Sequence, residues 1–99
     1  MSWADRAIAE LREGRSAVVR PHGHSMRPKV LSGAEVALEP VALAELAVGD
    51  VVLCRVAGNV YLHLVTALGE DRVQIGNNRG KINGWTRAVY GRATAIRNP

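Results

Sequence analysis

The feature that most constrains this chain is the regular interruption of short apolar runs by Gly, Pro, Asn and Asp. From residue 16 onward, apolar residues recur mostly at every second position between these interruptions. A period of two is typical of strands with one buried face, and short breaks that contain Gly are typical of turns between antiparallel strands. We therefore predict six strands and one polar loop. The strands cover residues 17–20, 35–41, 51–56, 60–67, 72–76 and 88–96, and the loop covers 77–84.

One amphipathic helix is expected before the strands. Over residues 2–13, four apolar side chains recur at helical spacing: Trp3, Ala7, Ile8 and Leu11. Ser2 could cap the start of this helix and Gly14 could end it. We expect the helix, within segment 1–15, to cover the core of the domain formed by residues 16–99. The alternative is that it offers a surface to a partner protein. The predicted fold class is mainly β: a small, coiled, antiparallel β domain with one N-terminal helix.

Composition narrows the class of protein further. The chain has 99 residues, which suits one domain. Its single cysteine, Cys54, excludes a disulfide framework and is best explained as a small buried hydrophobe. No apolar run is long enough to span a membrane or to form the core of a signal peptide. We expect a cytoplasmic protein without a membrane anchor and without a cofactor. Open edges in so small a sheet could pair two copies into a homodimer.

Charge is distributed unevenly along the chain. All nine carboxylates lie at or before Asp71, and every charged residue from Arg72 onward is basic. A basic end of this kind suits an acidic partner. However, no aromatic pattern of the base-stacking type accompanies these basic residues. We therefore do not expect a nucleic-acid-binding role.

Ser25 is the first candidate for a catalytic residue. It lies between Pro21 and Pro28, in a segment too broken for a strand and too short for a helix, where a hydroxyl can be held exposed on a stiff backbone. Gly23 removes side-chain bulk beside it, so backbone N–H groups there could face a developing oxyanion. The alternative is a serine that forms the turn by bonding to its own backbone.

A nucleophilic serine needs a base, and the three histidines are the candidates. His22 and His24 flank Ser25 so closely that we expect their side chains to point away from it. His63 instead falls within the predicted strand 60–67, where apolar neighbours would keep its imidazole neutral near pH 7. It is either a base for the serine or a histidine of the core.

Several stretches of the sequence carry a family pattern. They are Gly-His-Ser-Met-Arg-Pro at 23–28, Leu-Ser-Gly-Ala-Glu-Val at 31–36 and Val-Gly-Asp-Val-Val at 48–52, followed by 61–65, 76–78 and 89–93. Together they resemble the signal peptidase I and SOS-repressor (LexA-type) superfamily of serine peptidases. That superfamily carries Gly-x-Ser-Met-x-Pro around its nucleophile and a Gly-Asp pair that opens the next strand. The resemblance covers roughly residues 16–97.

The resemblance implies both a fold and a set of site residues. The fold would be that of the signal peptidase and LexA C-terminal type. Ser25 takes the position of the nucleophile, with its own N–H as one oxyanion donor, and His63 takes the position of the base. The oxyanion and substrate-binding positions implied are Gly23, His24, Met26 and Asn77. Position 77 is also where the family carries the acid that would help to orient a histidine base, and here it is an amide.

The resulting hypothesis is a serine endopeptidase that uses a Ser25–His63 dyad to cleave a peptide or protein precursor or regulator by acyl transfer. Substrate would lie extended along a strand edge and add its backbone to the sheet. The resemblance also implies small residues beside the cut. Two alternatives stay open. One is a weak or inactive pseudo-peptidase that serves as a protein-binding module, and the other is a zinc site formed by His22, His24 and His63.

Overall fold

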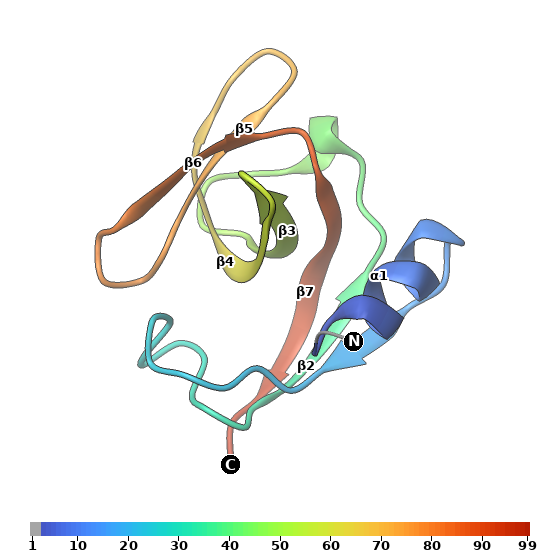
Figure 1. The fold of residues 1–99 in the computed structure, drawn as a ribbon, viewed down its shortest axis with the longest axis vertical. Helices are drawn as coiled ribbons and strands as arrows, with labels where there is room; N and C mark the ends of the chain where they lie inside the picture. Colours follow the sequence, from blue (N-terminus) through green and yellow to red (C-terminus); the bar gives the residue numbers. More distant parts are fainter. Residues whose placement is uncertain (1–2) are drawn as a thin grey trace.

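In the computed structural model, which describes residues 3–99, seven strands form one antiparallel sheet and a short helix packs against it (Figure 1). The mainly β fold class with one N-terminal helix is thereby confirmed. The helical elements are α1 (Asp5–Arg12) and the 3-10 helix η1 (Leu43–Glu45). The strands are β1 (Ala17–Val19), β2 (Glu35–Glu39), β3 (Val51–Val56), β4 (Asn59–Leu68), β5 (Val73–Gly76), β6 (Ile82–Thr86) and β7 (Val89–Arg97).

The order of the strands places β3 and β4 inside the sheet. The sheet runs β1-β2-β7-β3-β4-β5-β6, and each neighbouring pair is antiparallel. The far end then coils back toward β3: Thr86 Oγ1 donates to Arg55 O at 2.7 Å, and Arg55 N donates to Ala88 O at 2.9 Å. The sheet is therefore coiled, as Figure 1 shows. β1 and β6 are its outer strands, and the homodimer expected through strand edges stays a prediction.

One predicted element needs correction. The polar loop expected over residues 77–84 ends earlier, because Ile82–Thr86 forms β6 and pairs with β5. Asn83 and Gly84 carry the usual sequence signal of a loop. Gly84, with φ of +137°, lies in the strand because its backbone pairs with Ile75 of β5. The other predicted strands are present with slightly different ends, and β3 has the predicted bounds.

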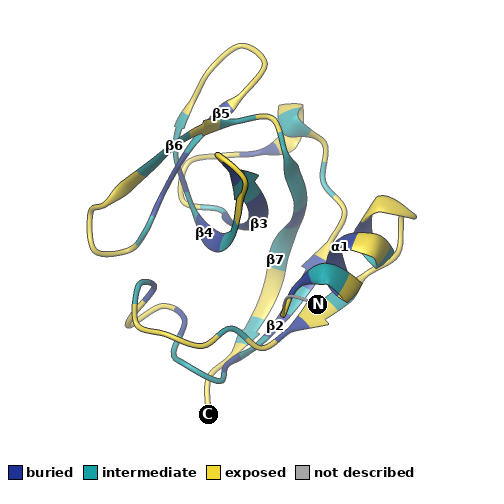
Figure 2. Ribbon diagram, viewed as in Figure 1, coloured by how far each residue is buried: buried dark blue, intermediate teal, exposed yellow. Residues whose placement is uncertain are grey.

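The core consists of two apolar clusters, one on each face of β3. Most of β3 is buried, as its colour in Figure 2 shows. The first includes Leu53 and Leu62, and the second includes Val52, Cys54 and Ile75. Because successive residues of a strand point to opposite faces, β3 is buried on both sides. Cys54 is fully buried, as predicted, and its burial raises the pKa of the thiol to about 12.

α1 covers the first cluster, as predicted. Its Ala7, Ile8 and Leu11 are buried against the sheet. Gly91 of β7 allows this close approach, because a Cβ atom there would lie 2.9 Å from Leu11 Cδ2. Trp3, which the helical pattern assigned to the same apolar side, remains 48% exposed. Because α1 begins only at Asp5, Trp3 lies outside the helix, and helical spacing does not determine its burial.

The start of α1 differs from the prediction. The helix begins at Asp5, after an N-cap Ala4 whose side chain makes no capping hydrogen bond. Ser2, the predicted cap, lies outside the described residues. Within residues 3–99, no helix combines the length and the apolar character needed to cross a membrane.

We expect the contact between α1 and the sheet to contribute measurably to stability. Leu11→Ala removes a side chain that is only 3% exposed, so the free energy of unfolding should fall by about 2–5 kcal/mol. Arg12→Ala, an exposed neighbour, is the matched control and should change it by less than about 0.5 kcal/mol. Urea unfolding measures both values. Equal losses in the two variants would contradict this role for the buried side of α1.

Candidate active site

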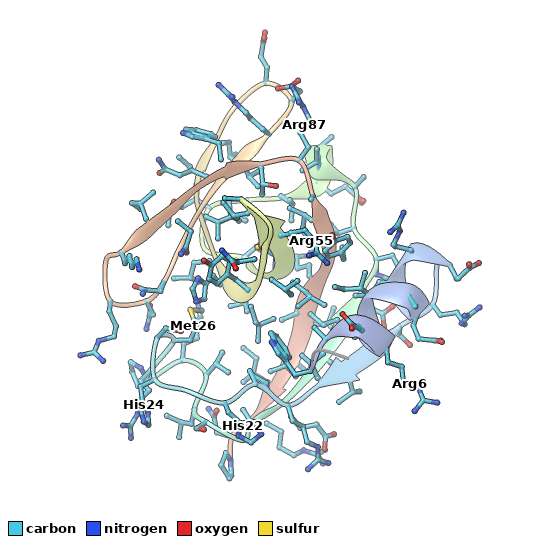
Figure 3. The ribbon with its side chains drawn as sticks, viewed as in Figure 1. Arg6, His22, His24, Met26, Arg55 and Arg87 are labelled. Atoms are coloured by element: carbon cyan, nitrogen blue, oxygen red, sulfur yellow. The ribbon has the colours of Figure 1, made fainter. Side chains whose placement is uncertain are left out.

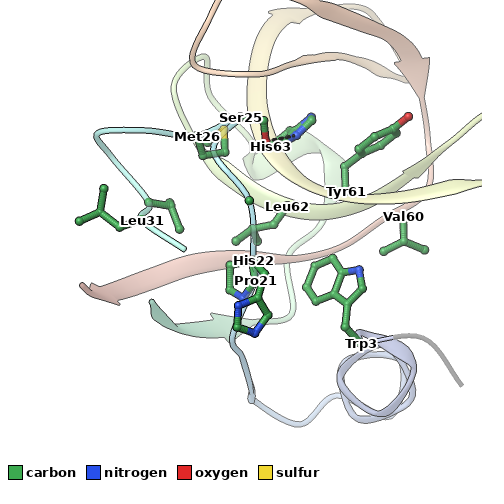
Figure 4. Close-up of a pocket in the computed structure, with 12 residues that line it drawn as sticks. Trp3, Pro21, His22, Ser25, Met26, Leu31, Val60, Tyr61, Leu62 and His63 are labelled. Atoms are coloured by element: carbon green, nitrogen blue, oxygen red, sulfur yellow. Dashed lines mark hydrogen bonds between the residues drawn. The ribbon is translucent and has the colours of Figure 1, made fainter. Parts of the chain in front are cut away.

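Ser25 and His63 lie within hydrogen-bond distance of each other, although 38 positions separate them in the sequence. Ser25 Oγ is 3.1 Å from His63 Nε2, and Figure 4 marks this contact between the two side chains. Ser25 is half-buried, whereas His63 is only 7% exposed. The serine comes from the loop between β1 and β2, and the histidine comes from β4. The fold therefore brings a hydroxyl and an imidazole together from two separate elements.

The β1–β2 loop is closed on itself near its base. Gly33 N donates to Pro21 O at 2.8 Å, and Gly23 N donates to Ser32 Oγ at 3.1 Å. Gly23 has φ of +122°, a backbone conformation that residues with a side chain rarely adopt. The shape of the turn that leads into the serine thus depends on a glycine at position 23.

Contacts from elsewhere in the chain fix the backbone at Ser25 and in the two residues that follow it. Asn78 of the β5–β6 turn donates twice: its N–H to Ser25 O at 3.0 Å and its Nδ2 to Arg27 O at 2.9 Å. Met26, next to the serine, is 5% exposed and packs in the first core cluster. Figure 3 shows Met26 turned toward the sheet. The backbone that carries the hydroxyl is therefore anchored by hydrogen bonds and by apolar packing.

β4 holds His63 on the face that belongs to the second core cluster. Tyr61 lies two residues earlier in the strand and hence on the same face. The two rings stack, with centroids 4.8 Å apart and an interplanar angle of 23°. In the neighbouring strand β3, Val52 is the residue that pairs with His63. Stacking and pairing together restrict the orientation of the imidazole.

The second ring nitrogen of His63 bonds to Asn83 of β6. Nδ1 lies 2.7 Å from Asn83 Oδ1. Since a carbonyl oxygen only accepts, Nδ1 carries the proton, and Nε2 of the neutral ring presents its lone pair to Ser25 Oγ. A general base that activates a serine needs this tautomer. Asn83 therefore orients the imidazole, through an amide and not a carboxylate.

Sequence reasoning did not find Asn83. Residue 83 was assigned to a loop, and the family pattern directed attention to position 77. One signal was present. Asparagine is uncommon within strands, so a half-buried asparagine between Ile82 and Trp85 indicates a specific hydrogen-bond partner. That signal is usable only once Ile82–Thr86 is identified as a strand.

Asn77, which the resemblance implied as a binding position, bonds within its own turn. Its Oδ1 accepts hydrogen bonds from the N–H groups of Arg79 and Lys81, at 2.9 and 3.0 Å. Asn77 N also donates to Lys81 O at 2.8 Å. These bonds shape the turn between β5 and β6. The Asn77 side chain thus organises the turn from which Asn78 reaches the serine loop.

The environment of His63 favours its neutral form. Burial lowers the pKa of His63 from its ordinary value of 6.5, the hydrogen bond with Asn83 acts in the opposite direction, and the positive charge of Lys81 lowers the pKa further. The net effect is a lowered pKa, so the imidazole is mostly neutral at pH 7 and able to accept a proton.

One backbone donor beside the hydroxyl is open to an oxyanion. Within residues 3–99, the Ser25 N–H donates no hydrogen bond to another group of the protein. The Gly23 N–H, which was expected to act with it, already donates to Ser32 Oγ. The Ser25 N–H is therefore a donor that could stabilise negative charge beside Oγ without breaking an existing bond.

Within the described chain, neither of the other two histidines hydrogen-bonds to Ser25 or His63. His24 is exposed, with its Nδ1 3.5 Å from Arg27 Nη1, and Figure 3 shows it on the outer side of the loop. His22 lies at the cavity next to Ser25. Across the described part of the chain, His, Cys, Asp and Glu side chains form no group of three that could hold a metal ion. The zinc alternative therefore has no ligand set to support it.

A cavity of about 300 Å³ opens beside the pair (Figure 4). Its walls come from Trp3, two residues before α1, from the β1–β2 loop and from β4. The lining residues are Trp3, Pro21, His22, Gly23, Ser25, Met26, Val30, Leu31, Val60, Tyr61, Leu62 and His63. Of the four binding positions implied by the resemblance, Gly23 and Met26 belong to this lining, whereas His24 and Asn77 do not.

Comparison of the chain with known protein families, with curated proteins and with solved structures gives no match. The class of the site is therefore defined by its own chemistry. It is a serine hydroxyl bonded to a neutral imidazole, which an amide orients, beside an open cavity.

We expect His63 to titrate below pH 6.5, because burial disfavours the imidazolium ion. Asn83→Asp places a negative charge beside Nδ1 and should raise this pKa. Asn83→Leu removes the acceptor while keeping the bulk, and should lower the pKa further. NMR titration of the His63 ring protons measures these changes. Asn98→Asp, which adds the same charge at the C-terminal end, is the control. An unchanged pKa in Asn83→Asp would contradict the contact between Asn83 and the imidazole.

Proposed function

We propose that this protein is a serine endopeptidase of the signal peptidase and SOS-repressor type, with Ser25 as nucleophile and His63 as general base. The observation that carries the proposal is the 3.1 Å contact between Ser25 Oγ and His63 Nε2. This distance lies in the range expected for a nucleophile and its base. The sequence pattern around Ser25 supports the same family independently of this distance.

In the first half of the reaction, His63 Nε2 takes the proton of Ser25 Oγ while Oγ bonds to the carbonyl carbon of the substrate. The C=O electron pair moves to oxygen, and the Ser25 N–H stabilises the resulting oxyanion. The imidazolium then gives its Nε2 proton to the leaving nitrogen as the C–N bond breaks. One peptide product leaves as an amine, and the other remains as an ester on Ser25.

In the second half, water replaces the amine. His63 Nε2 accepts a proton from the water molecule, whose oxygen bonds to the ester carbon. The second oxyanion collapses, the C–Oγ bond breaks and the imidazolium returns its proton to Ser25 Oγ. The second product leaves as a carboxylic acid. Throughout, the bond from Nδ1–H to Asn83 Oδ1 keeps Nε2 directed at the reacting atoms.

The edge of β4 supports an extended peptide as substrate. β5 pairs with β4 only from Leu64 onward, so within the described chain no strand adjoins residues 59–63 on that side. A peptide added there would form backbone hydrogen bonds with β4 and lie along the cavity, whose lining includes residues 60–63. Its carbonyl group would then approach Ser25.

The amide of Asn83 bears on the expected rate. An asparagine can hold a catalytic histidine in the correct tautomer, as the Cys-His-Asn arrangement of papain-like proteases illustrates. It does not, however, offer the negative charge that stabilises an imidazolium ion. We therefore expect a slower enzyme than one with a carboxylate at this position, and the non-catalytic binding module remains the outcome to test against.

We expect catalysis to depend on both members of the pair. Ser25→Ala and His63→Ala should each lower kcat/KM on an unfolded protein substrate by about 10³-fold or more, because each removes the activated nucleophile. A fluorophosphonate probe, which reacts with activated serine hydroxyls, should label Ser25 in the wild-type protein and not in His63→Ala. Mass spectrometry locates the label.

The control for these experiments is Ser16→Ala, since Ser16 is an exposed serine outside the site. It should retain wild-type cleavage and labelling. If Ser25→Ala cleaves as well as the wild-type protein, any activity comes from elsewhere and the peptidase proposal is wrong. A wild-type protein that binds peptides but neither cleaves them nor reacts with the probe would establish the binding module instead.

A further inference from the structure

We propose that the cavity beside Ser25 accepts one large apolar side chain of the substrate, aromatic or branched aliphatic, and that Trp3 sets this preference. The inference rests on the proposed function, because it names the substrate class of the same site. It departs from the small residues that the family resemblance implies beside the cut. Three features of the cavity carry it: its size, the chemistry of its walls and the position of Trp3.

The cavity is much larger than a small side chain requires. Its volume is about 300 Å³. A methyl group is comparable in size to a water molecule, which takes up about 30 Å³ in the liquid. On a peptide that lies along the cavity, an alanine side chain would leave more of this volume to water than a leucine or phenylalanine side chain, which would displace that water and bury its own apolar surface.

The walls of the cavity are chemically suited to an apolar group. Much of the lining is aliphatic, contributed by Val30, Leu31, Val60 and Leu62. Within the described chain, no carboxylate, lysine or arginine belongs to this lining. A lysine or arginine side chain of the substrate would lose its hydration there without gaining a carboxylate partner, which is costly. The walls therefore select against basic residues.

Trp3 supplies a wall at the edge of the cavity. It lies just before α1, and the helix is anchored to the core through Ile8 and Leu11, so the indole is attached to a fixed element. Figure 4 shows Trp3 extending toward the cavity beside Val60. The indole is 48% exposed, which leaves apolar surface that a bound side chain would cover. Tryptophan is among the residues that most often dominate binding energy at such positions.

A competing occupancy is two small side chains in place of one large one. In an extended peptide, residues two apart point to the same side about 7 Å apart, so two alanines could enter the same cavity. This alternative predicts no gain from a large side chain at any position. The binding experiment below separates the two occupancies.

The test uses the Ser25→Ala variant, so that binding is measured without cleavage. The probes are capped six-residue alanine peptides with a terminal lysine for solubility, carrying a single Phe or Leu at each internal position in turn. Isothermal titration calorimetry gives their dissociation constants. At one position, Phe or Leu should bind at least about tenfold more tightly than Ala, as expected for burying a large apolar side chain. Equal affinities at every position would overturn the proposal.

Substitution of Trp3 tests its part in the preference. Trp3→Ala, added to Ser25→Ala, should reduce the advantage of Phe or Leu over Ala by about tenfold. Trp85→Ala is the matched control, because Trp85 is also an exposed indole but does not line the cavity. If Trp3→Ala does not fold, Trp3→Leu, which shortens the wall, should shift the preference in the same direction.

The two proposals fail in different ways. Preference for a large apolar side chain in Ser25→Ala, combined with no cleavage by the wild-type protein, would overturn the peptidase function and leave the binding preference standing. Cleavage by the wild-type protein with equal affinity for all peptides would overturn the preference alone. An advantage of Phe or Leu that survives both Trp3 variants would overturn the role of Trp3.

Discussion

The hydrogen bond between Ser25 Oγ and His63 Nε2 is the interaction on which the proposed chemistry depends. It joins a turn that has no regular structure to a central strand, and each side is held by other contacts. Asn78 and the buried Met26 fix the turn, while Tyr61 stacks on the imidazole. The pair is therefore set by the fold before any substrate binds, which is the condition for efficient general-base catalysis.

Much of the fold could be predicted from the sequence because local signals agree with it. β3 has the predicted bounds, since its apolar run is closed by turn residues at both ends and is buried on both faces. β6 was missed for the opposite reason. Asn83 and Gly84 favour a loop, and only pairing with β5, a long-range contact, makes Ile82–Thr86 a strand. In the same way, helical spacing placed Trp3 with the core, whereas the helix begins only at Asp5 and leaves the indole at the cavity.

Ser25 and His63 could be singled out from the sequence because each stands in a local context that suits its chemistry. A serine in a glycine-containing turn and a histidine in an apolar strand are the two groups that acyl transfer requires, and the structure brings them together. The supporting residues could not be assigned in this way. The amide that orients His63 comes from the strand that the sequence obscures, and Asn77, in the position suggested by the family, bonds to the backbone of its own turn. Orientation depends on tertiary geometry, which spacing along the chain does not encode.

The most direct measurement is the ¹⁵N NMR spectrum of the His63 imidazole at pH 8, where the ring is neutral. The geometry predicts a protonated Nδ1, bonded to Asn83, and an unprotonated Nε2 whose resonance changes in Ser25→Ala when its hydrogen-bond donor is lost. The opposite tautomer, with the proton on Nε2 and no response to Ser25→Ala, would mean that the imidazole cannot accept the serine proton. The nucleophile and base assigned to this protein would then be incorrect.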